Sequence, residues 1–74
     1  MVNTKAEIIN QACRIIRQNL GETTAEMYKK FYKTKGEHDI LLSVRELLIE
    51  IVGPANAEVQ LKPLFNQFSN FAHE

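Results

Sequence analysis

This chain of 74 residues has few of the features that strengthen small proteins, with one cysteine, two prolines and three glycines. The single thiol, Cys13, excludes an intramolecular disulfide, and the two histidines, His38 and His73, lack the spacing of a metal site. A single core of this size rarely supplies more than about 3–5 kcal/mol without such a cross-link. Either the helices of this chain pack very well, or another chain contributes to its stability.

Long apolar runs are also missing. No run approaches the roughly 20 residues that span a bilayer, and the first residues lack the apolar region of a secretory signal. We therefore expect no membrane interaction and a cytoplasmic location, which the free thiol fits. An apolar fraction of 45% predicts a globular chain and not a disordered one.

The residue patterns of an enzyme are absent as well. There is no glycine-rich phosphate loop, no Ser/His/Asp set and no metal-ligand spacing. Cys13 lies on the apolar face of its segment, which favours a small buried hydrophobe over a reactive thiol. Glu46 and Glu50 share one helix face, and we interpret them as part of an exposed stripe, not as an acid–base pair. We predict no enzymatic activity, cofactor or metal, and no small-molecule substrate is evident.

Helical periodicity is what the chain does have. No stretch alternates apolar and polar residues with period two, so we predict no sheet. The glycines, together with Pro54, divide the chain into four segments. The first runs from about residue 3 or 4 to 20, and the second from about 23 to 35, with Thr23 and Glu26 at capping-box spacing. The third covers about 37–52.

The fourth segment contains Pro63, which lacks an amide donor and clashes with the preceding helical turn. The simplest interpretation is a short helix over 54–61 and another from Pro63, with Phe65, Phe68 and Phe71 as core residues. A single kinked helix over 54–72 is the alternative. The predicted fold class is all-α, a small bundle of four or five short helices forming one domain over 1–74. No internal repeat is apparent.

Apolar residues surround most of the third segment. They leave one narrow polar stripe, formed by Asp39, Ser43, Glu46 and Glu50. A helix that is apolar nearly all round is a buried helix, so we expect the bundle to pack around a nearly fully buried third helix. Four short helices need less apolar surface than this, and the surplus predicts that a second copy or another protein covers it. The predicted partner interface is Arg45, Leu48, Ile49 and Val52.

The charges are divided unequally along the chain. Residues 1–35 carry seven basic and three acidic side chains, a net charge of +4, whereas residues 36–74 carry two basic and six acidic ones, a net charge of −4. Such a chain can satisfy its charges internally, against a second copy, or against an anionic partner.

The segment 28–35 interleaves lysines with aromatic residues, a pattern suited to phosphates and exposed bases. A net charge of zero and the scarcity of side chains that read base edges count against nucleic acid. The candidate surface for an anionic partner comprises Tyr28, Lys29, Lys30, Tyr32, Lys33 and Lys35.

The sequence therefore predicts a small non-enzymatic interaction or regulatory module that acts as a homodimer through its third helix. A nucleic-acid-binding regulator using the segment 28–35 is the alternative. The residues alone do not separate a homodimer from one half of a heteromeric complex.

Overall fold

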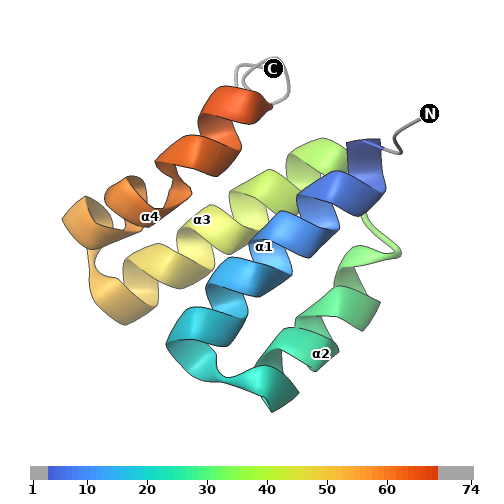
Figure 1. Ribbon diagram of the computed structural model, residues 1–74, viewed down its shortest axis with the longest axis horizontal. Coiled ribbons are helices and arrows are strands. Elements are labelled where there is room, and N and C mark those ends of the chain that lie inside the picture. The colour runs from blue at the N-terminus through green and yellow to red at the C-terminus, as the bar shows by residue number, and fades with distance from the viewer. Residues whose placement is uncertain (1–3, 69–74) are drawn as a thin grey trace.

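A computed structural model describes residues 4–68 of the chain, and these residues form four helices and no strand (Figure 1). The helices are α1 (Thr4–Leu20), α2 (Glu22–Tyr32), α3 (Glu37–Val52) and α4 (Pro54–Gln67). The all-α prediction is confirmed, and α3 has the predicted bounds.

Consecutive helices form two hairpins, α1–α2 and α3–α4, and a single glycine joins the helices of each. Gly21 has φ 94° and ψ 172°, and Gly53 has φ 88° and ψ 160°. A positive φ with an extended ψ is open almost only to glycine. The Gly21 amide donates to the Arg17 carbonyl and the Gly53 amide to the Ile49 carbonyl, both at 3.0 Å. The two joints therefore have the same construction.

Two local predictions are wrong. Helix α2 starts at Glu22, with Gly21 as its N-cap and no capping side chain, so the capping box at Thr23 does not form. Helix α4 continues through Pro63, so the break into two helices at that residue is not found, and the kinked-helix alternative holds as far as Gln67. Figure 1 shows α4 bent along its length, as expected where a proline removes a hydrogen bond to the preceding turn.

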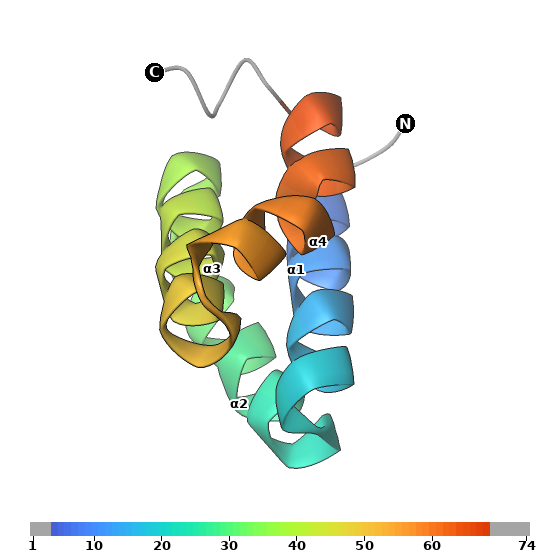
Figure 2. The same cartoon turned by 90° about the vertical axis from the view of Figure 1, so that its left-hand side faces the viewer.

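Helix α1 packs against each of the other three helices, and α3 packs extensively against α1 and α4. Figure 1 shows α1 between α2 and α3, and Figure 2 shows α3 and α4 beside it from the left-hand side of that view. The predicted packing around a nearly fully buried third helix is not confirmed, because α1 and not α3 contacts all the other helices extensively.

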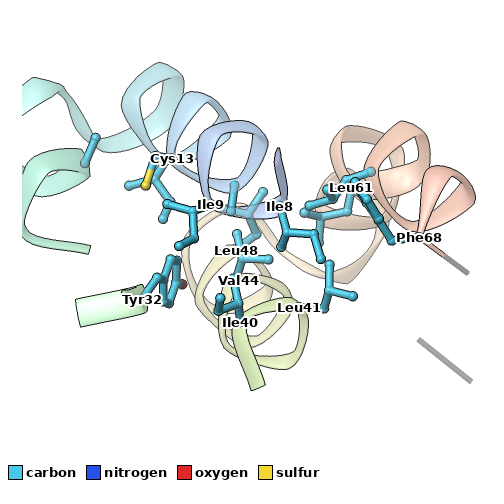
Figure 3. Close-up of a cluster of buried hydrophobic side chains, with 14 of the residues drawn as sticks. Ile8, Ile9, Cys13, Tyr32, Ile40, Leu41, Val44, Leu48, Leu61 and Phe68 are labelled. Atoms are coloured by element: carbon cyan, nitrogen blue, oxygen red, sulfur yellow. The ribbon is translucent and has the colours of Figure 1, made fainter. Parts of the chain in front are cut away.

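The core contains only apolar side chains and one tyrosine, since no charged residue is buried among residues 4–68. Figure 3 shows these side chains converging between α1, α3 and α4, with Tyr32 entering from α2. Its hydroxyl lies 3.0 Å from the Ser43 Oγ, which satisfies the polar end of a fully buried ring and ties α2 to α3.

Six buried positions of each hairpin correspond at an offset of 32 residues, the separation of Gly21 and Gly53. The other buried residues, Cys13, Leu61 and Phe68, have no buried counterpart. The buried pairs are Ile8 and Ile40, Ile9 and Leu41, Ala12 and Val44, Ile16 and Leu48, Ala25 and Ala57, and Tyr32 and Leu64. Few of these pairs are identical, and for that reason the sequence shows no obvious repeat. The correspondence is one of position and polarity.

The molecule measures 32 × 26 × 17 Å along its principal axes. The shortest dimension accommodates two layers of helices, whose axes pack about 8–10 Å apart. Each helix in such a two-layer arrangement keeps an outward side. Helix α3 buries Ile40, Leu41 and Val44, but Leu42 is 41% exposed and Ile51 is 38% exposed within the single chain.

Candidate functional site

A groove of about 690 Å³ lies between α3 and α4. Ile49 from α3 and Val59, Leu61 and Phe65 from α4 give it an apolar lining. Leu61 is buried and forms the floor, whereas Val59 is 72% exposed. An exposed apolar lining within a concave surface is typical of a site that binds another molecule.

Three charged side chains line the same groove. Arg45 comes from α3, and Glu58 and Lys62 come from α4. Arg45 and Glu58 form no ion pair with each other in the chain. The groove therefore presents charges of both signs beside an apolar strip.

The predicted partner interface is only partly accessible. Arg45 is exposed, and Ile49 and Val52 are half-buried. Leu48 is fully buried in the core, so its assignment to an interface is wrong. Apolar residues lie on nearly all sides of α3, so the sequence does not show which of them are buried. Only the packing of α1 against α3 determines that. Val59 was not predicted, because a single apolar residue between Glu58 and Gln60 carries no periodic signal.

The candidate anionic-partner surface on α2 also needs a correction. Tyr32 is fully buried, and burial raises its pKa to about 12, although the Ser43 hydrogen bond acts in the opposite direction. It cannot stack on an exposed base. Lys30 and Lys33 are exposed, as predicted, whereas Lys29 and Lys35 are half-buried.

The remaining rings of this surface are engaged with one another. Tyr28 lies 5.6 Å from Tyr32 and 6.3 Å from Phe31, measured between ring centroids. Phe31 is 47% exposed, but the Lys35 ammonium lies 4.8 Å from the centre of its ring. This cation–π contact covers one face of the most exposed ring in the segment. A stacking platform for nucleic acid therefore finds little support in the geometry.

Cys13 is buried, and this burial raises the pKa of its thiol, while the nearby Lys29 and Arg17 charges oppose the shift. A protonated, inaccessible thiol is a poor nucleophile. Among residues 4–68, no three His, Cys, Asp or Glu side chains come together in a way that could hold a metal ion. No helix in this part of the chain combines the length and apolar character needed to cross a membrane.

The opposite charges of the two halves are not neutralised by contact within the fold. Between described residues, the single ion pair joining a lysine or arginine to a carboxylate is Arg17 Nε to Glu22 Oε1, at 3.1 Å. Both partners belong to the α1–α2 hairpin and are substantially exposed. The basic and acidic hairpins thus carry their charge on the surface.

Comparison with known proteins adds no relative to this description. No protein-family model matches the chain, and neither the curated proteins nor the solved structures contain a match to it.

Proposed function

We propose that this protein is a non-enzymatic interaction module that forms a homodimer through the α3–α4 groove. The observation that carries the proposal is the apolar lining of Ile49, Val59 and Phe65, which a single chain leaves accessible to water. Covering these side chains with a partner would remove apolar surface from water, at about 25 cal/mol per Å². It would also complete the burial of α3 that its sequence predicts.

The charges of the groove favour a second copy as the partner. A two-fold axis through the groove brings α3 of one copy against α4 of the other, and the same contact occurs twice. Arg45 of each copy then faces Glu58 of the other, so the rim is self-complementary. The apolar strip supplies the affinity, and these charges fix the orientation.

Light scattering after size exclusion tests the dimer. We expect a dimer at low and at high salt, because the strip is apolar. Val59→Glu should give a folded monomer, since it places a carboxylate in the contact. Met27→Glu is the matched control: Met27 is 64% exposed and occupies the corresponding position of the other hairpin. A wild-type monomer at every concentration, or equal effects of the two variants, would contradict the proposal.

A charge exchange tests the symmetry of the contact. Arg45→Glu and Glu58→Arg should each weaken the dimer, because each places like charges opposite one another. An equimolar mixture of the two variants should form a heterodimer, since both of its contacts then pair opposite charges. The double variant Arg45→Glu/Glu58→Arg should also form a dimer. Failure of both the mixture and the double variant would exclude this two-fold arrangement.

A partner other than a second copy would give a monomer in the first experiment. The nucleic-acid alternative stays a prediction with weaker support, since one of its tyrosines is buried and Lys35 covers a face of Phe31.

A further inference from the structure

The two hairpins have the same frame but opposite groove chemistry. At the offset of 32 residues, Leu61 and Phe65 of the α3–α4 groove correspond to Lys29 and Lys33 of the α1–α2 hairpin. Both of these lysines line a hollow of about 260 Å³ between α1 and α2. One hairpin therefore has leucine and phenylalanine in its groove where the other has two lysines in its hollow.

Three lysine side chains line the hollow, together with Ala6, Ile9 and Asn10. Lys5 comes from the first turn of α1, and Lys29 and Lys33 come from the C-terminal end of α2. Lys5 Nζ donates to the Lys33 carbonyl at 2.8 Å, which holds its charge at this end of α2. Asn10 adds a neutral amide, and no acidic side chain lines the hollow among the described residues.

The charges that line this hollow favour the binding of an anion. Three lysines and, among residues 4–68, no carboxylate line this depression, so its net positive charge attracts an anion. A phosphate group, with several acceptor oxygens, can accept hydrogen bonds from more than one lysine and from Asn10.

We propose that the hollow formed by Lys5, Asn10, Lys29 and Lys33 binds a compact phosphate-bearing ligand. The ligand is compact because the basic surface is short. Glu26 lies one helical turn before Lys29, and Glu22 pairs with Arg17 near the other end of the hairpin. A long polyanion following the hairpin would meet both carboxylates, whereas a single phosphate group at the hollow meets neither.

The first probe is inorganic phosphate. Its binding is measured by amide chemical shifts at constant ionic strength and pH, with chloride as the reference anion. We expect saturable shifts at Asn10, Lys29 and Lys33. The variant Lys29→Gln/Lys33→Gln should weaken phosphate binding by about tenfold or more. The matched control, Arg14→Gln/Lys30→Gln, removes the same charge from exposed positions of the same hairpin outside the hollow and should bind as wild type.

Three outcomes would overturn the proposal. The first is that chloride causes the same amide shifts as phosphate, and the second is that both double variants lose the same phosphate affinity. The third is that a single-stranded oligonucleotide binds more tightly than phosphate and that its binding also depends on Lys30. The last would favour the nucleic-acid alternative. A monomer in the dimer experiment does not affect this proposal, because the hollow belongs to the other hairpin and neither result requires the other.

Discussion

The α1–α2 and α3–α4 hairpins show how one helical frame can carry two different surfaces. Both turn at a glycine of nearly the same conformation, and both bury side chains at corresponding positions. They differ where the frame does not constrain them: lysines of the first hairpin stand where leucine and phenylalanine stand in the second. The comparison teaches that most core positions are shared by the two hairpins, while the residues that line their grooves differ.

The largest expected effect is the loss of folding when a carboxylate is placed at a buried position, compared with the next residue along the chain. Leu48→Glu and Ile16→Glu should abolish folding, since each would place a carboxylate at a fully buried position. Ile49→Glu and Arg17→Glu, one residue further on, should leave the chain folded because both side chains reach the surface. Far-ultraviolet circular dichroism would distinguish these results. A folded Leu48→Glu protein would show that the core is misplaced.

A pH dependence tests Tyr32, which corresponds to Leu64 in the other hairpin. Its folded pKa is raised to about 12, so the folded state keeps it neutral where the unfolded state ionises. Stability is therefore fully present below pH 10 and should fall between pH 10 and 12, by on the order of 2 kcal/mol. Urea unfolding across this range would measure the loss.

Tyr32→Phe is the control for that titration. It should remove most of the fall above pH 10, while costing about 1 kcal/mol at neutral pH because the hydrogen bond to Ser43 is lost. An equally steep fall in wild type and variant would assign the alkaline loss to other groups.

The two joints should respond alike to substitution. Gly21→Ala and Gly53→Ala should each cost about 1–2 kcal/mol, because alanine rarely adopts their positive φ and nothing near either glycine offers compensating contacts. Gly36→Ala is the matched control, since φ is −78° there and alanine fits; it should cost less than either joint, because only the N-cap preference for glycine over alanine is lost. Thermal unfolding would measure all three. Clearly unequal costs at Gly21 and Gly53 would break the equivalence of the joints.

The smallest effect is expected at the ion pair of the first joint, which has no counterpart at the second because Pro54 stands where Glu22 does. Glu22→Gln should change the unfolding free energy by less than about 1 kcal/mol, since both partners are exposed. Urea unfolding at low and high salt would detect it. A larger loss would mean that the pair helps to define the hairpin.

The sequence predicted the four helical segments, but not the continuity of α4 through Pro63 or the faces that the helices bury. Periodicity and the glycines predicted four helical segments, and α3 has the predicted bounds. The inward side of α3 could not be predicted, because apolar residues surround it and the position of α1 selects Leu48 over Ile49. Tyr32 was placed on the surface because lysines flank it, and its contact with Ser43 becomes visible only when α2 and α3 are brought together. The correspondence between hairpins was hidden because most paired core residues differ in identity.

The most direct test of the two surfaces is the concentration dependence of the amide chemical shifts in the wild-type chain. On raising the protein concentration, we expect the resonances of Ile49, Val59 and Phe65 to move, while those of Asn10, Lys29 and Lys33 stay fixed. That result would place self-association on the apolar groove and leave the basic hollow available to an anion. Movement confined to the α1–α2 hairpin, or none at any concentration, would contradict the account.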